Sequence, residues 1–99
     1  EVFAPVTTVT PYPDFDEAVA RINETEYGLQ AGIFTSNVRR LMQAWERLDV
    51  GGVMGNDIPS FRVDRMPYGG SKASGLGREG VRYAIQEMTE PRLLTLQTE

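Results

Sequence analysis

The feature that most constrains this chain is a glycine-rich stretch, residues 67–80, which holds five of the ten glycines in the sequence. A glycine inside a helix or strand costs roughly 0.5–1 kcal/mol relative to alanine, so this density disfavours regular structure. The backbone must instead follow a tight path that residues with a Cβ atom find hard to adopt. Because an amphipathic segment over 78–88 follows at once, we predict a loop that leads into a helix.

Three of these glycines also fit the spacing G-x-G-x-x-G, namely Gly75, Gly77 and Gly80. In dinucleotide-binding proteins such glycines let the pyrophosphate approach a helix N-terminus. That motif requires a hydrophobic strand before the first glycine, and here residues 69–74 read Gly-Gly-Ser-Lys-Ala-Ser. We therefore interpret the glycines as a structural turn, and keep a small nucleotide-binding domain as an alternative hypothesis.

The composition excludes several kinds of site. The chain has neither cysteine nor histidine, which excludes disulfides, thiol nucleophiles, Ser-His triads and the usual zinc sites, and we expect no metal. A net charge of −4 without a basic run argues against nucleic acid as a partner. With no signal peptide and no apolar run near the ~18 residues of a membrane span, we expect a cytoplasmic protein without a membrane partner. Because the first residue is Glu rather than Met, we also expect a fragment or processed product.

The order of predicted elements indicates an α/β fold. We expect a Val- and Thr-rich strand over 2–12, followed by a helix that is capped by Asp14 and ended by Gly28. A buried strand over 29–35 comes next, then a helix capped by Ser36 or Asn37, and then a short strand over 52–56. Short connections between alternating strands and helices favour a parallel βαβαβ unit. Trp45 falls on the apolar face of the second helix and is predicted to belong to the core.

The second half of the chain is predicted to be loop, helix and strand. The loop over 57–74 follows a strand, and in parallel sheets ligands gather beyond the carboxyl ends of the strands. A helix is expected from Arg78 until Pro91 blocks it, with Glu79 in its first turn, where a carboxylate favours the positive end of the helix dipole. A terminal strand is expected over 92–98. An apolar strand at the end of a small chain is an unpaired edge unless another backbone covers it.

Four segments of the sequence resemble motifs of the aldehyde dehydrogenase superfamily. The segment Glu-Val-Phe-Ala-Pro-Val over 1–6 is similar to E-[IV]-F-G-P-V, and residues 27–35 resemble Y-G-L-x-A-G-[VI]-F-T. Asn56 resembles the family's Asn at the end of the next strand, and residues 67–79 are similar to P-F-G-G-x-K-x-S-G-x-G-R-E. Their order and spacing cover essentially the whole chain, so it is identified as a C-terminal segment of a member of this family.

The resemblance implies part of an enzyme that oxidises an aldehyde to an acid, or acylates CoA in some branches, with NAD or NADP. In the family, a Cys attacks the aldehyde, hydride leaves to the nicotinamide, and a Glu activates water. Neither residue lies in this segment, so no catalytic residue is assigned and the fragment alone is expected to be inactive. Residues 1–91 correspond to the C-terminal part of the catalytic domain, and residues 92–99 to a strand that joins an oligomerisation sheet.

The resemblance also assigns binding residues. Glu1 matches the family Glu that hydrogen-bonds the nicotinamide ribose, and Phe3 matches the Phe near the nicotinamide ring. Phe61 and Tyr68 correspond to walls of the substrate tunnel. Arg62, in the same loop, is a candidate partner for an acidic group of the substrate.

Two departures from the family pattern affect these assignments. Ala4 replaces the usual Gly, which is expected to shift Phe3 slightly, and Tyr68 replaces Phe and adds a hydroxyl that can bond a polar substrate. Arg65 is a second candidate for an acidic substrate group, and a solvated or interface arginine is the alternative for both arginines.

The predicted partners follow from the same resemblance: an aldehyde substrate, the remainder of the enzyme, and a second copy bound through the terminal strand. The rival hypothesis is a free-standing, non-catalytic α/β module that binds a protein through that strand.

Overall fold

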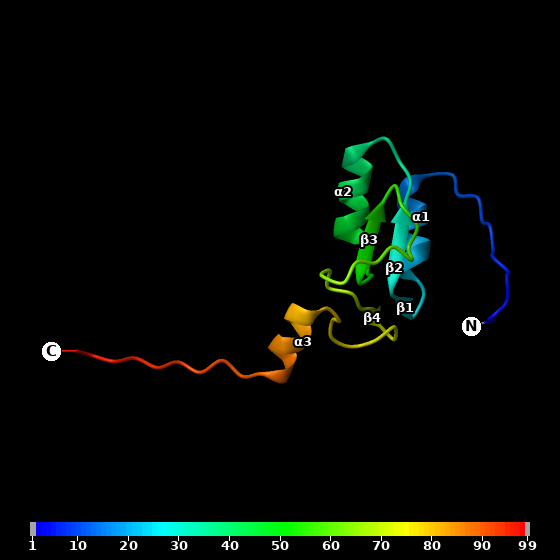
Figure 1. Cartoon of the computed structure of the whole chain (residues 1–99). Helices are drawn as coiled ribbons and strands as arrows, with labels where there is room; N and C mark the ends of the chain where they lie inside the picture. Colours follow the sequence, from blue (N-terminus) through cyan, green and yellow to red (C-terminus); the bar gives the residue numbers. More distant parts are fainter. Residues whose placement is uncertain (1, 99) are drawn as a thin grey trace.

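Two parallel strands form the centre of the fold in the computed structural model, which describes residues 2–98. β2 (Gln30–Ile33) pairs with β3 (Gly52–Gly55) in a register that places Ala31 opposite Val53. Helix α2 (Val38–Arg47) connects the two strands, and helix α1 (Phe15–Asn23) precedes them (Figure 1). The predicted α/β class is confirmed, with two paired parallel strands where three were expected.

Local sequence signals start both of these helices. The Asp14 side chain accepts a hydrogen bond of 2.9 Å from the backbone N–H of Glu17. The Asn37 side chain accepts bonds from the N–H groups of Arg39 and Arg40 at 3.0 and 3.3 Å. Such caps satisfy donors that have no partner inside a helix. The prediction of Asp14 is confirmed, and of the two candidates for the second cap the structure selects Asn37.

The end of α1 differs from the prediction. The helix is capped at Glu24, and Gly28 lies four residues later in a strand, so its assignment as the terminating glycine was wrong. Gly28 is buried, and a Cβ atom there would overlap the carbonyl oxygen of Asp49. This glycine therefore serves a close approach of two chain segments rather than a helix end.

The buried core is small and lies where α1 and α2 meet the strands. It consists of Val19, Ala44 and Leu48, with partly buried residues around them. Trp45 is 62% exposed, so its predicted place in the core was wrong. On this helix the core is formed by Ala44 and by the C-cap residue Leu48, one turn apart, and Trp45 is not part of it.

A second pair of strands joins the glycine-rich stretch to the segment that follows α1. β1 (Tyr27–Gly28) pairs antiparallel with β4 (Ser71–Lys72), so Gly28 lies opposite Ser71. Helix α3 (Val81–Met88) follows and is N-capped by Gly80 at a φ of 109°. This helix begins three residues later than predicted, because Gly77 and Gly80 both hold the backbone at positive φ.

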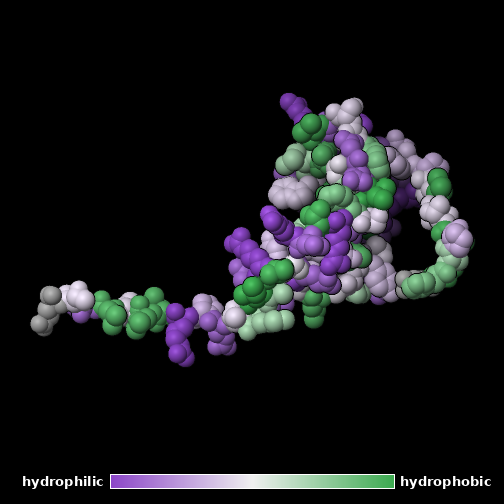
Figure 2. Space-filling view, in the orientation of Figure 1, coloured by the Kyte–Doolittle hydropathy of each residue, from purple (hydrophilic) through white to green (hydrophobic). Residues whose placement is uncertain are grey.

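The two ends of the chain are extended but do not form the predicted strands. Residues 2–12 and 92–98 have no sheet partner within the described chain, and the C-terminal segment runs away from the body (Figure 1). A strand requires hydrogen bonds to a neighbouring backbone. Apolar side chains cluster on the protruding C-terminal segment (Figure 2), where Leu93, Leu94 and Leu96 are at least 77% exposed.

The dimensions of the molecule reflect these open ends. The radius of gyration is 18.4 Å, compared with about 13 Å for a compact domain of 100 residues. The chain exposes 8629 Å² of surface, whereas a folded monomer of 11.0 kDa exposes about 5,600 Å². Much apolar surface is therefore left uncovered. Among the described helices, none combines the length and apolarity needed to cross a membrane.

Candidate functional site

The glycine-rich stretch is held in place by hydrogen bonds to the C-terminal end of α1 and the turn that follows. The Lys72 ammonium donates to the carbonyl oxygens of Asn23 and Thr25 at 3.2 and 2.9 Å. The backbone N–H of Gly28 donates to the Ser74 hydroxyl at 2.8 Å. Lysine near a helix C-terminus satisfies carbonyls that lack a partner and complements the helix dipole. Lys72 and Ser74 therefore act here as structural anchors.

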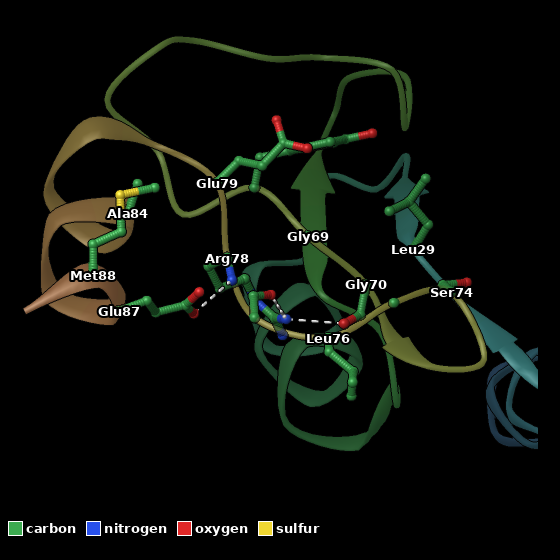
Figure 3. Close-up of a pocket in the computed structure, with 13 residues that line it drawn as sticks. Leu29, Gly69, Gly70, Ser74, Leu76, Arg78, Glu79, Ala84, Glu87 and Met88 are labelled. Atoms are coloured by element: carbon green, nitrogen blue, oxygen red, sulfur yellow. Dashed lines mark hydrogen bonds between the residues drawn. The ribbon is translucent and has the colours of Figure 1, made fainter.

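The three glycines of the G-x-G-x-x-G spacing do not form a phosphate cradle. The carboxylate of Glu87, on α3, accepts the Arg78 N–H at 3.3 Å (Figure 3). A Cβ atom at Gly77 would lie only 2.7 Å from this carboxylate. A carboxylate beside the N–H groups repels an anionic pyrophosphate and occupies a donor that phosphate needs. This geometry supports the interpretation as a structural turn and disfavours a nucleotide-binding domain.

Arg78 closes the turn from the other side. Its guanidinium donates to the carbonyl oxygens of Gly70 and Gly77 at 2.9 and 2.7 Å (Figure 3). The turn and α3 enclose a cavity of about 690 Å³, whose lining includes Glu79 and Met88. The cationic group that could attract a ligand in this cavity is thus already bound to backbone carbonyls.

Two of the predicted substrate residues, Arg62 and Tyr68, meet beside this turn. The guanidinium carbon of Arg62 lies 4.2 Å from the centroid of the Tyr68 ring, in cation–π contact. Arg62 Nη2 also donates to Glu79 Oε2 at 2.6 Å. Tyr68 and Glu79 are themselves joined by a β-bridge with backbone hydrogen bonds of 3.2 and 2.6 Å. The three residues form one connected cluster, which we call the Arg62 cluster.

A second cavity lies against the Arg62 cluster. Its volume is about 360 Å³, and it is lined by Leu29, Gln30, Pro59, Ser60, Arg62 and Tyr68. Leu29 and Gln30 lie at the start of β2, and Pro59 to Arg62 belong to the loop after β3. The cavity thus offers apolar walls and one guanidinium to a small molecule.

The other predicted site residues are not part of the lining of this cavity. Phe61 lies between two lining residues, Ser60 and Arg62, but is itself 44% exposed and does not line the cavity. Phe3 is on the extended N-terminal segment, with its side chain 92% exposed and its backbone at a φ of 49°. Glu1, the predicted ribose contact, lies outside the described residues. The structure therefore brings Arg62 and Tyr68 together at one cavity, and neither Phe61 nor Phe3 lines it.

Glu79 is a residue of this site that sequence reasoning placed elsewhere. We predicted it in the first turn of a helix, where a carboxylate favours the dipole, but α3 starts at Val81. Its partner Arg62 is 17 residues away in the chain. No local pattern connects two charges at that separation. Among residues 2–98, no group of three or more acidic side chains is arranged to hold a metal ion.

Comparison with known proteins gives a consistent result. The aldehyde dehydrogenase family matches residues 1–94. An aspartate-semialdehyde dehydrogenase from Pseudomonas canavaninivorans is 53% identical, a 3-sulfolactaldehyde dehydrogenase from Priestia megaterium 48%, and a lactaldehyde dehydrogenase from Methanococcus maripaludis 45%. Each similarity covers 97% of this chain and 20 or 21% of the relative. The chain thus spans about a fifth of the length of the curated relatives it matches.

Solved structures agree with this result. Aldehyde dehydrogenase 21 from Physcomitrella patens, in complex with the product succinate, has a TM-score of 0.78 and 54% identity over 80% of this chain and 16% of its own. Glyceraldehyde-3-phosphate dehydrogenase from Methanocaldococcus jannaschii, complexed with NADP, has a TM-score of 0.71 and 51% identity over 74% and 16%. An NAD⁺ complex of an aldehyde dehydrogenase from Bacillus cereus has a TM-score of 0.85 and 39% identity over 91% and 18%.

Proposed function

The chain belongs to the aldehyde dehydrogenase family, and we propose that it is the C-terminal part of an enzyme that oxidises an aldehyde to a carboxylic acid with NAD or NADP. The observation that carries this proposal is that 97% of the chain matches relatives of which it spans only a fifth. The exposed apolar surface supports it, because a larger protein would cover that surface. In this proposal residues 1–91 complete the catalytic domain and residues 92–99 form a separate strand. A cytoplasmic location stays a prediction.

The proposed chemistry is divided between this segment and the rest of the enzyme. The nucleophilic Cys must come from elsewhere, since this chain contains none, and the segment alone is expected to be inactive. The bound nicotinamide supplies the hydride acceptor. Glu1 and Phe3 are proposed to contact its ribose and ring, and the exposed Phe3 side chain is free to pack against a planar group.

The substrate is proposed to be an aldehyde with an anionic group. Arg62 and Tyr68 line one cavity, and a guanidinium is suited to bind carboxylate, sulfonate or phosphate. Phe61 is proposed as a further apolar wall once the rest of the enzyme is present. Two relatives are named for aspartate semialdehyde and 3-sulfolactaldehyde, which contain a carboxylate and a sulfonate group, respectively. Lactaldehyde, named for another relative, is neutral, so the family likeness alone does not fix this choice.

The terminal segment is proposed to pair with a sheet of a second copy. Residues 92–98 are extended, and their leucines are exposed. The rival function, a free-standing module that binds a protein through this segment, is disfavoured by a radius of gyration of 18.4 Å and a core of three buried residues. A module that folds alone normally buries a larger share of its surface.

The test uses the complete enzyme encoded by the gene. Its kcat/KM is measured with succinate semialdehyde and with butanal, which have the same number of carbons but differ in the terminal carboxylate. We expect NAD(P)-dependent oxidation of the anionic aldehyde, and Arg62→Ala to lower its kcat/KM about 10- to 100-fold. Arg82→Ala, an exposed arginine of α3, is the matched control. If the enzyme oxidises neither aldehyde, the proposed aldehyde dehydrogenase activity is wrong. If Arg62→Ala leaves the KM for succinate semialdehyde unchanged, the proposed preference for an anionic substrate is wrong.

A further inference from the structure

We propose that Glu79 and Tyr68 are positioning residues that hold the Arg62 guanidinium as a fixed receptor for the anionic end of the substrate. This inference rests on the function proposed above. It assigns a role in substrate selection to Glu79, which the sequence had marked only as a helix-terminal carboxylate.

The first step is that Arg62 is fixed from two directions. Glu79 Oε2 accepts its Nη2 at 2.6 Å, and the Tyr68 ring lies 4.2 Å from its Cζ. Both contacts come from one rigid frame, because the backbones of Tyr68 and Glu79 are bonded to each other in both directions. A contact to either residue alone would leave the guanidinium free to rotate. Together the two contacts define both its plane and the direction of one edge.

The second step concerns where Glu79 lies. The smaller cavity, of about 360 Å³, is lined by Arg62 and Tyr68 but not by Glu79. Glu79 instead lines the larger cavity beside α3, where Arg62 is absent from the lining. The two cavities share Leu29 and Tyr68 in their linings, so they are neighbours. Glu79 bonds to the guanidinium without lining the proposed substrate cavity, and in this proposal it leaves that cavity free for the anionic substrate.

The third step is that donors remain for a ligand. A guanidinium carries five N–H donors, and the Glu79 bond uses one edge. The side chain of Arg62 is 49% exposed, so other N–H groups can meet a carboxylate, sulfonate or phosphate. Because the conformational freedom of this long side chain is already lost in the folded enzyme, less is lost when substrate binds. Positioning should therefore appear mainly in the KM of anionic aldehydes.

The experiment compares Glu79→Ala, Glu79→Gln and Tyr68→Leu in the complete enzyme. We expect Glu79→Ala to raise the KM for succinate semialdehyde about five- to tenfold, with kcat within about twofold and a much smaller change for butanal. Glu79→Gln keeps an acceptor oxygen and should recover part of the loss. Tyr68→Leu removes the cation–π contact and should resemble Glu79→Ala. Glu90→Gln, an exposed carboxylate beyond α3, serves as the control.

Two results would overturn the proposal. A lower KM for succinate semialdehyde in Glu79→Ala would show that Glu79 competes with the substrate, and an unchanged KM would show that Arg62 needs no support. Arg62→Ala separates these from a failure of the proposed function. If Arg62→Ala raises the KM for succinate semialdehyde and Glu79→Ala does not, only the positioning role is wrong. If Glu79→Ala loses activity toward both aldehydes, Glu79→Gln decides: a KM raised for succinate semialdehyde but not for butanal supports positioning, and an equal change for both aldehydes refutes it.

Discussion

The Nζ atom of Lys72 donates a hydrogen bond of 2.9 Å to the carbonyl oxygen of Thr25, 47 residues away in the chain. A second bond, to Asn23, joins the same ammonium group to the last residue of α1. Through these bonds a residue of the glycine-rich stretch fixes the exit of a helix near the other end of the fold. These bonds give the loop predicted from the glycines a defined position against the end of α1.

Lys72→Met is expected to destabilise the complete protein by about 1.5–3 kcal/mol, because hydrogen bonds to a charged group are lost and two carbonyls are left without a donor. The Lys72 side chain is only 22% exposed, so water replaces these bonds poorly. The change is measured as the shift in the denaturant midpoint. Arg82→Ala should move the free energy of unfolding by no more than about 0.5 kcal/mol. Equal effects of the two variants would contradict the anchoring role.

Gly51→Ala and Gly55→Ala test close approach at the two ends of β3. A Cβ atom at Gly51 would overlap the carbonyl oxygen of Gly69, which is backbone and cannot yield easily. A Cβ atom at Gly55 would meet only the flexible end of the Leu41 side chain, at 2.7 Å. We expect a loss above about 3 kcal/mol at Gly51 and about 1 kcal/mol at Gly55. A larger loss at Gly55, in thermal or chemical unfolding, would argue against this packing.

Asn37→Ala is expected to lower the free energy of unfolding by about 1 kcal/mol, since the amide oxygen caps the N–H groups of Arg39 and Arg40. Ser36→Ala should have a much smaller effect, because the cap bonds of α2 come from its neighbour. Both substitutions are measured by equilibrium unfolding. A greater loss in Ser36→Ala would show that the helix begins one residue earlier.

The segment 1–99 expressed alone is expected to self-associate. Its exposed apolar residues include Trp45, Ile85 and Leu94, and exposed apolar patches of this extent normally belong to interfaces. Sedimentation velocity should show species larger than a monomer, and the proportion should rise with concentration. A well-folded monomer at all concentrations, with cooperative unfolding, would be the opposite outcome and would favour the free-standing module.

Local rules explain which predictions succeeded. Asp14 and Asn37 begin helices because a capping side chain bonds to a backbone N–H two or three residues away, which the sequence shows directly. The strands at Gln30–Ile33 and Gly52–Gly55 were found because each is an apolar segment bounded by turn residues. The predicted burial of the first was wrong, since its four residues are only partly buried.

The errors arose where a residue's role depends on a distant segment. Trp45 has the apolar character of a core residue, but on this helix Ala44 and Leu48 form the core instead. Gly28 lies at a position typical of a helix-terminating glycine, but a residue without a Cβ atom is needed there because the Asp49 backbone lies next to it. Composition and periodicity describe one side of a contact and give no information on what lies opposite.

The sequence by itself determined the α/β class, the starts of α1 and α2, the family and the loop character of residues 67–80, since these depend on neighbours in the chain or on whole motifs. Only the tertiary structure decided that Arg62, Tyr68 and Glu79 form one cluster and that Glu87 takes an N–H a phosphate would need. These contacts join residues 6 to 17 positions apart through a turn whose path is set by glycines at positive φ. Such a path depends on how the loop packs between β1 and α3, and no local pattern of side chains specifies it.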